Sequence, residues 1–272
     1  MDGPGALRVV PLTLGWVELP ITVSLHGDTT GRRLREPVPA VLVETKQGWV
    51  LLDTGPNPAL FADAPLYRRF HGRDPDIRST LPGTGDPLLE ELARAGLGLS
   101  DIVAVGISHL HWDHAGGIRH FAATGAPVYL QRAELEYGLS AQPGPEANGM
   151  FRIDYDDPAI DWHLAGGDTT IAPGVSAVSS AGHTPGHQSF VVDIAEEAGG
   201  GGFVFACDAA DLTDNIENEV PVGGFIGCSP EDTVGSIRRL KALAADKGYR
   251  VVPGHDPVAW VALTAELSAR WP

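Results

Sequence analysis

Ten residues near the middle of the chain, 108–117, read S-H-L-H-W-D-H-A-G-G. They place three imidazoles and one carboxylate within six positions, at His109, His111, Asp113 and His114. The apolar run 102–107 precedes them and predicts a buried strand that ends at this cluster. An exposed, histidine-rich loop is the alternative, but ten histidines in 272 residues make such clustering improbable. Because imidazole and carboxylate suit zinc, manganese, iron or cobalt, the segment predicts a metal site.

The same event recurs along the chain: a predicted strand ends, and a histidine or aspartate follows in a turn or the adjoining loop. The further residues in this position are Asp53, His183, Asp208 and His255. The carboxyl ends of strands are where α/β sheets carry their chemistry. We therefore expect all of these side chains to meet along one sheet edge.

Hydrophobic periodicity and turn residues predict an α/β fold. The expected strands are 7–17, 21–25, 38–45, 48–53, 102–107, 127–130, 174–180, 188–194, 203–207 and 249–252. The expected helices are 87–96 after an N-cap at Asp86, 115–121, 132–137, 230–243 after an N-cap at Ser229, and 258–269. We expect 56–87 and 140–165 to be irregular, the first as a substrate cover or as plain surface. With no repeat and no dividing linker, one domain over 1–272 is the economical prediction.

Composition excludes several partners. The 43% hydrophobic content is ordinary for a globular protein, and 19 Lys plus Arg against 35 Asp plus Glu give a formal charge of -16. A nucleic-acid backbone or an anionic lipid surface would be repelled, so we expect no nucleic acid and no membrane partner. Cys207 and Cys228 cannot build a disulfide framework, and the first residues do not resemble a secretion signal. We therefore expect a cytoplasmic protein.

The number of candidate ligands favours two metals over one. Seven side chains are too many for one tetrahedral ion, and they suit two divalent ions that share a carboxylate: His109, His111, Asp113, His114, His183, Asp208 and His255. Two such ions can hold a hydroxide, polarise a carbonyl and stabilise a leaving oxygen, which is hydrolytic chemistry. The alternative is a structural metal site, but structural zinc usually takes closed, cysteine-rich ligand sets.

These motifs resemble those of the metallo-β-lactamase superfamily, whose fold is an αββα sandwich. The resemblance rests on H-L-H-W-D-H at 109–114, the later G-H-T-P-G-H, Asp208 and P-G-H. Within the superfamily the chain resembles the N-acyl homoserine lactonases, which are quorum-quenching enzymes. The supporting stretches are V-L-L-D-T-G at 50–55, A-G-H-T-P-G-H-Q-S at 181–189, E-N-E-V-P-V-G-G-F at 217–225 and S-I-R-R-L-K at 236–241. The similarity runs from about Pro39 onward.

This resemblance implies a role for each ligand. His109, His111 and His183 would bind the first metal, Asp113, His114 and His255 the second, and Asp208 would bridge them. A hydroxide held between the two ions would attack the ring carbonyl of a lactone, and Asp113 would orient it and pass on its proton. Asp53 and His187 would contact the ligands and fix their tautomers. A homodimer is compatible with the resemblance.

One position departs from the lactonase pattern. The lactonases carry a tyrosine three residues after the bridging aspartate, where its hydroxyl contacts the substrate, and this chain has Asp211 there. An ionised carboxylate cannot donate that hydrogen bond, so either another donor replaces it or the substrate differs. A pyridoxolactonase-type substrate or another small lactone or ester is therefore the alternative. Trp112 lines the acyl pocket or packs as a buried aromatic residue.

Other members of the superfamily remain competing interpretations. They are β-lactamases, glyoxalase-II-like thioesterases, phosphodiesterases, one-iron sulfur dioxygenases and redox proteins of the flavodiiron kind. The absence of a cysteine ligand argues against the commonest zinc β-lactamases, because Cys207 should point away from the metals. Retention of Asp113, His114 and His255 argues against a one-iron site.

Overall fold

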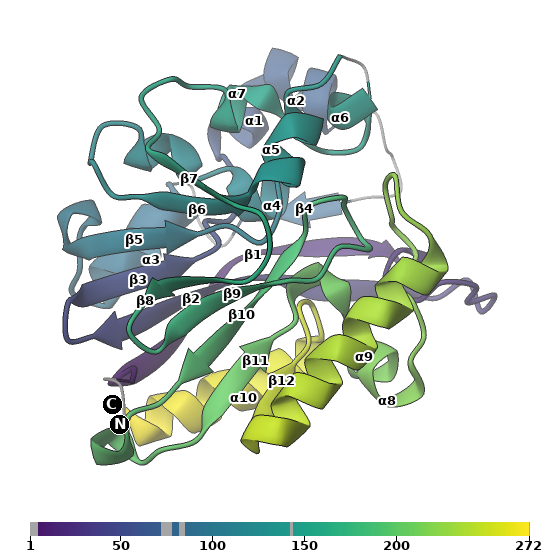
Figure 1. Ribbon diagram of the computed structural model, residues 1–272. Coiled ribbons are helices and arrows are strands. Elements are labelled where there is room, and N and C mark those ends of the chain that lie inside the picture. The colour runs from purple at the N-terminus through teal and green to yellow at the C-terminus, as the bar shows by residue number, and fades with distance from the viewer. Residues whose placement is uncertain (1–4, 72–77, 82–84, 142–143, 272) are drawn as a thin grey trace.

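The computed structural model describes residues 5–71, 78–81, 85–141 and 144–271. Two β-sheets lie face to face, and helices cover the outer side of each, which gives the predicted αββα arrangement (Figure 1). The larger sheet has the strand order β4-β1-β2-β3-β5-β6-β7. Its strands are β1 Arg8–Pro20, β2 Arg33–Thr45, β3 Gly48–Leu52, β4 Arg78–Thr80, β5 Ile102–Gly106, β6 Val128–Gln131 and β7 Trp162–Ala165.

The smaller sheet has the strand order β12-β11-β10-β9-β8. Its strands are β8 Thr169–Ala172, β9 Val175–Ser179, β10 Gln188–Asp193, β11 Gly202–Phe205 and β12 Arg250–Val252. The helices of the described residues are α1 Ala59–Ala62, α2 Ala64–Phe70, α3 Pro87–Arg94, α4 Trp112–Ala115, α5 Arg132–Gly138, α6 Gly144–Ala147, α7 Arg152–Tyr155, α8 Thr213–Asn218, α9 Pro230–Lys247 and α10 Pro257–Arg270. Within the described part of the chain, no helix has the length and apolar character needed to cross a membrane.

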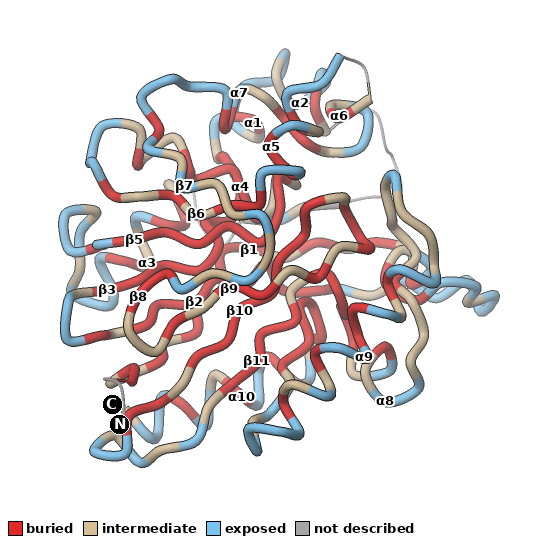
Figure 2. Tube along the Cα trace, in the orientation of Figure 1, coloured by how far each residue is buried: buried red, intermediate tan, exposed pale blue. Residues whose placement is uncertain are grey.

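Side-chain alternation along the strands builds the layers. In β2, Val38, Ala40 and Leu42 face the helices on the outer side of the larger sheet, whereas Val41 and Val43 face the smaller sheet. This period of two is what a strand buried on both faces requires. Figure 2 shows the resulting buried residues concentrated in the strands of both sheets.

Helices close three sides of the core. Leu88 and Leu92 of α3 pack on the outer face of the larger sheet, and α9 covers the smaller sheet through Ile237 and Leu240. The helix α10 inserts Trp260 into the core between the sheets, and the Trp260 Nε1–H donates to Thr13 Oγ1 at 3.0 Å. Each large apolar side chain removed from water contributes on the order of 1.5–3 kcal/mol.

Strand direction brings the candidate ligands to one edge. Parallel strands β3 and β5 pair Leu52 with Gly106, so Asp53 and the 108–114 segment leave the larger sheet at the same end. Parallel strands β11 and β12 pair Phe205 with Val252, and Asp208 and His255 each lie three residues beyond this pair. The sheet registers therefore explain why residues far apart in sequence converge.

Both predicted N-caps are confirmed. The Asp86 side chain accepts from Leu89 N at 3.3 Å at the start of α3. Ser229 Oγ accepts from Asp232 N at 3.2 Å at the start of α9, whose first residue is a proline. A side-chain cap of this kind satisfies one of the free N–H groups at a helix start.

Several predicted boundaries were wrong. Residues 21–25 do not form a strand, because Ile21–Val23 is a 3-10 turn after Pro20. The supposedly irregular stretch 56–87 contains α1, α2 and the edge strand β4, although 72–77 and 82–84 lie outside the described residues. The stretch 140–165 likewise contains α6, α7 and β7. These elements are too short to show a period, and contacts such as Phe70 with Phe151 stabilise them instead.

Candidate metal centre

The segment 108–114 is held in place by Asp53, which follows the neighbouring strand β3. Asp53 accepts from Ser108 N at 2.7 Å through Oδ1 and from Ser108 Oγ at 2.9 Å through Oδ2. Asp53 has a φ of 57°, a left-handed backbone conformation that non-glycine residues seldom adopt outside functional sites. The helix α4 spans only Trp112–Ala115, and its single turn brings Asp113 and His114 back over the strand ends. The predicted helix 115–121 was therefore wrong, because Ile118–Phe121 forms a 3-10 turn.

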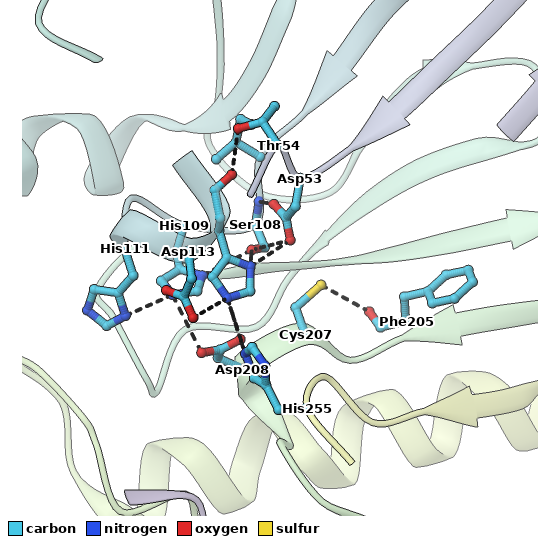
Figure 3. Close-up of polar contacts among 12 residues, drawn as sticks. Asp53, Thr54, Ser108, His109, His111, Asp113, Phe205, Cys207, Asp208 and His255 are labelled. Carbon is cyan, nitrogen blue, oxygen red and sulfur yellow. Dashed lines mark hydrogen bonds and ion pairs between the residues drawn. The ribbon is translucent and has the colours of Figure 1, made fainter. Parts of the chain in front are cut away.

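The Asp208 carboxylate stands between two groups of histidines (Figure 3). Its Oδ2 lies 3.4 Å from His183 Nε2 and 3.6 Å from His109 Nε2. Its Oδ1 lies 3.1 Å from His255 Nε2 and 3.2 Å from His114 Nε2. Each oxygen thus faces a different pair of imidazoles, which is the arrangement of a carboxylate that can bridge two ions.

All seven sequence-predicted ligands meet here. One group has ligand atoms within 4.8 Å of one another and consists of His109, His111, His183 and Asp208. A second group of the same span consists of Asp113, His114 and His255. In the first group, His111 Nδ1 lies 2.9 Å from both His109 Nε2 and His183 Nε2. In the second, His114 Nε2 lies 3.8 Å from Asp113 Oδ2.

The tautomers of the second group fit a metal. The His114 Nδ1 faces Asp53 Oδ2 at 2.9 Å, and the His255 Nδ1 faces the Pro37 carbonyl at 2.8 Å. Each ring donates its Nδ1–H to that acceptor and turns its Nε2 toward the other ring. The two Nε2 atoms lie 3.2 Å apart, close enough to share a proton or a cation. A divalent metal can take the place of that proton, and the donor set therefore fits a metal.

Charge differs between the two groups when no metal is bound. Burial lowers the pKa of His109 and His111 well below the ordinary histidine range. Burial also lowers the pKa of His255, but the carboxylates of Asp208 and Asp211 outweigh it and raise the pKa to about 10. The second group therefore holds at least one proton that a metal must displace.

A cavity of about 440 Å³ opens onto both groups. Phe70, Trp112 and Phe151 supply apolar walls, and Glu36 and Asp211 bring carboxyl groups. No Lys or Arg stands among the described residues that line it. Trp112 fits both predictions made for it, because its ring lines the cavity and also packs on His71, with ring centroids 4.9 Å apart.

Comparison with protein families decides the identity. Residues 33–255 match the family model described as the metallo-beta-lactamase superfamily. The chain belongs to the metallo-β-lactamase superfamily. Among curated relatives, an N-acyl homoserine lactonase of a Bacillus species is 34% identical, and the alignment covers 84% of each chain. The N-acyl homoserine lactonase AttM of Rhizobium johnstonii is 31% identical over 93% of this chain and 95% of the relative.

A solved structure of the superfamily has the same fold over nearly the whole chain. It is an N-acyl homoserine lactone hydrolase with the product N-hexanoyl-L-homoserine bound at its catalytic metal centre. It is 28% identical, with a TM-score of 0.81, and the match covers 95% of this chain and 96% of that chain. The αββα prediction is thereby confirmed.

Two residues predicted to contact the ligands of this superfamily site differ in what they touch. Asp53 contacts the ring of His114, as described above. His187 contacts no ligand ring by hydrogen bond: its Nδ1 lies 2.9 Å from Ser180 Oγ, and its Nε2 accepts from Asp208 N at 3.1 Å. Burial lowers the pKa of His187 to about 3, so it is neutral and free to accept. Its effect is to fix the backbone that carries Asp208.

Sequence reasoning missed a buried carboxylate that joins the two ligand loops. Glu134 of α5 accepts from Leu110 N at 3.0 Å, from Thr184 Oγ1 at 2.8 Å and from Gly186 N at 2.9 Å. Leu110 lies between two predicted ligands, and Thr184 directly follows His183. Burial raises the pKa of Glu134 to about 7, against the effect of these donors. Nothing in the sequence around Glu134 distinguishes it from the exposed Glu136 on the same helix, so no sequence signal could have found it.

The cysteine next to Asp208 faces away from the ligands. Cys207 Sγ lies 3.9 Å from the Phe205 carbonyl, and its side chain packs against the core between the sheets (Figure 3). Burial raises the pKa of this thiol well above its usual range, so it is a neutral packing group. Its position agrees with the prediction from strand alternation.

Proposed function

We propose that this protein is a metal-dependent hydrolase that opens the ring of an N-acyl homoserine lactone or a related small lactone. The observation that carries the proposal is the Asp208 carboxylate, whose two oxygens face two groups of imidazoles at the floor of a cavity of about 440 Å³. Similarity to relatives named N-acyl homoserine lactonase, over 84% or more of their length, supports the lactone class.

Each ligand has a proposed position. His109, His111 and His183 would hold the first metal, Asp113, His114 and His255 would hold the second, and Asp208 would be shared between them. When bound, two divalent ions supply Lewis-acid chemistry and acidify a water molecule. Asp113 lines the cavity and is only partly buried, so its carboxylate can orient that water and accept its proton. The aromatic walls exclude bulk water and contact an acyl chain.

The lining of the cavity discriminates between substrate classes. Burial raises the pKa of the Glu36 and Asp211 carboxyl groups, that of Glu36 to about 7, and the described lining contains no Lys or Arg. A substrate with its own carboxylate or phosphate, such as a β-lactam or a phosphodiester, finds no ammonium or guanidinium partner on this wall. An uncharged lactone needs none, which favours lactone hydrolysis over the other reactions of the superfamily.

A proton-release assay tests the proposal. Purified, metal-loaded protein is mixed with lactones of several acyl lengths, and acid is followed with a pH indicator. The wild type should release acid, whereas His109→Ala and Asp208→Asn should lower the rate by at least a hundredfold. His163→Ala removes an exposed histidine of β7 and should leave the rate unchanged. A wild type that is inert toward the whole panel would contradict the proposal.

The acidic wall also favours a second candidate, a small lactone or ester that offers hydrogen-bond donors. The carboxyl oxygens of Glu36 and Asp211 can accept hydrogen bonds from such a substrate in either protonation state. A substrate of the pyridoxolactone type or a thioester is then the competitor to an acyl homoserine lactone. Asp211→Tyr separates the two, because it should raise acyl homoserine lactone turnover if Asp211 alters specificity. An unchanged substrate profile would show that this position is not the determinant.

We further propose zinc as the metal, a location in the cytoplasm, a single domain over 1–272 and a homodimer as the assembly. A common hydrophobic core supports the single domain, because Val41 and Leu52 of the larger sheet pack with Phe190 and Phe205 of the smaller. The ligand types support zinc, although they accept other divalent ions. Elemental analysis of purified protein and light scattering would test the metal and the assembly.

A further inference from the structure

Asp211 has a buried oxygen that nothing in the described chain satisfies. Its side chain is 5% exposed, and Asp211 Oδ1 has no hydrogen-bond partner among the described residues. The backbone fixes it there, because His255 N donates to the Asp211 carbonyl at 2.8 Å. Burying a carboxylate oxygen with neither a donor nor a cation is strongly unfavourable.

The surroundings increase the need for a cation. Asp211 lines the cavity together with Glu36, Asp113 and Asp208, and the described lining contains no Lys or Arg. The Glu36 carboxylate accepts from Ser24 Oγ at 2.7 Å and so has a donor that Asp211 lacks. Asp211 Oδ1 has no such donor among the described residues and can therefore take a cation as its partner.

The position of Asp211 identifies that partner. A ligand oxygen of Asp211 lies within 4.8 Å of ligand atoms of both Asp208 and His255. Two atoms bound to one ion at about 2.1 Å lie at most about 4.2 Å apart. The ligand atoms of Asp208, Asp211 and His255 therefore need to approach one another only slightly to share an ion. We propose that Asp211 is an additional ligand of the second metal position. With Asp113 and Asp208, it gives that position three carboxylates beside the imidazoles of His114 and His255.

This set of ligands changes the metal preference. The first position has three imidazoles and the shared Asp208, whereas the second is rich in carboxylate oxygen. Carboxylate ligands suit harder ions such as Mn²⁺ better than imidazole does. The second position therefore accepts Mn²⁺ more readily, relative to Zn²⁺, than the first position does. This inference rests on the proposed two-metal centre.

A titration that does not depend on activity tests it. Metal-depleted protein receives one equivalent of Zn²⁺ and is then titrated with Mn²⁺, and the fall of the free Mn²⁺ electron paramagnetic resonance signal gives the affinity. The variant Asp211→Asn should bind Mn²⁺ at least tenfold more weakly than the wild type. Its affinity for Zn²⁺ at the second position should fall by less, and Zn²⁺ should stay bound at the first position. Two controls are Glu36→Gln, which neutralises the neighbouring cavity carboxyl, and Asp214→Asn, which alters an exposed acid of α8. Both should stay within about threefold of the wild type.

Three results would overturn the inference. Mn²⁺ affinity of Asp211→Asn within threefold of the wild type would remove the ligand role. An equal loss in Glu36→Gln would mean that only the charge of the cavity matters. Equal losses of Mn²⁺ and Zn²⁺ in Asp211→Asn would remove the metal preference. If Asp211→Asn fails to retain the first Zn²⁺, Asp211→Ser replaces it under the same criteria. A wild type that binds neither metal would instead overturn the two-metal centre itself.

Discussion

Replacing Glu134 by alanine should damage both stability and metal binding, because one carboxylate holds two ligand loops. Glu134 is fully buried, and its three donors come from the loop of His111 and the loop of His183. In Glu134→Ala, two backbone N–H groups and one hydroxyl lose their acceptor. The loops are then free to separate, which misplaces ligands that belong to the same metal position.

The loss of unfolding free energy in Glu134→Ala follows from two opposing contributions. Each buried donor left without a partner costs about 1–3 kcal/mol, so three of them cost roughly 3–9 kcal/mol. Against this, burial raises the pKa of Glu134 from 4.5 to about 7. Ionising such a group at pH 8 costs the wild-type fold about 3 kcal/mol, which the variant avoids. The net loss of unfolding free energy at pH 8 is therefore on the order of 3 kcal/mol.

The same pKa fixes the direction of the pH dependence. Because the folded pKa is raised, the folded wild type binds more protons than the unfolded chain between pH 4.5 and about 7. This carboxyl therefore stabilises the wild type most below pH 4.5, and the contribution disappears as pH rises through 7. The variant lacks it, so the loss caused by Glu134→Ala should be larger at pH 5.5 than at pH 8 by about 2 kcal/mol.

Urea unfolding at both pH values, with a chelator present, measures the unfolding free energy without a contribution from metal binding. Glu136→Ala is the matched control, since Glu136 is an exposed acid on the same helix, and its unfolding free energy should change by less than about 0.5 kcal/mol. Competition with a chromophoric chelator should show zinc affinity of Glu134→Ala lowered about 10–100-fold. Wild-type stability at both pH values together with wild-type zinc affinity would refute the reasoning.

Two further predictions concern the metal groups. A Cβ added at Gly223 would lie 1.6 Å from the Thr22 carbonyl oxygen, so Gly223→Ala must shift the segment whose next carbonyl contacts His183 Nδ1. Affinity for the first zinc should fall at least tenfold by chelator competition, whereas Gly235→Ala, with open space around it on α9, should match the wild type. Because the pKa of His255 is raised to about 10, metal must displace its proton, and affinity at the second position should rise about tenfold per pH unit from 6.5 to 8.5. A metal affinity at the second position that does not change with pH would contradict the displacement of this proton.

The site was predictable because its ligands obey a local rule. Each of them follows a buried strand, and parallel pairing places those strand ends on one edge, so Asp208 and His255 could be joined to the 108–114 cluster without coordinates. Long strands and capped helices such as α9 were predictable for a similar reason, since their period and cap residues are adjacent in sequence.

What the sequence could not show depends on contacts between distant residues. Glu134 acts through donors 24 to 52 residues away, and nothing in its own neighbourhood marks it as buried. Glu36 lies within β2, where a charged side chain predicts an exposed position, yet it is 1% exposed and bound to Ser24. The short helices α1 and α2 are stabilised by aromatic packing across loops, and these helices, like α6 and α7, have no period to detect.

Lactone opening measured while metal is returned to the depleted protein tests the central claim most directly. The initial rate of acid release is recorded at each added equivalent of Zn²⁺, with bound metal counted by elemental analysis. We predict almost no turnover with the first equivalent, a rise through the second and a plateau at two ions per chain. Full activity at one ion per chain, or activity that persists in excess chelator, would contradict a two-metal hydrolase.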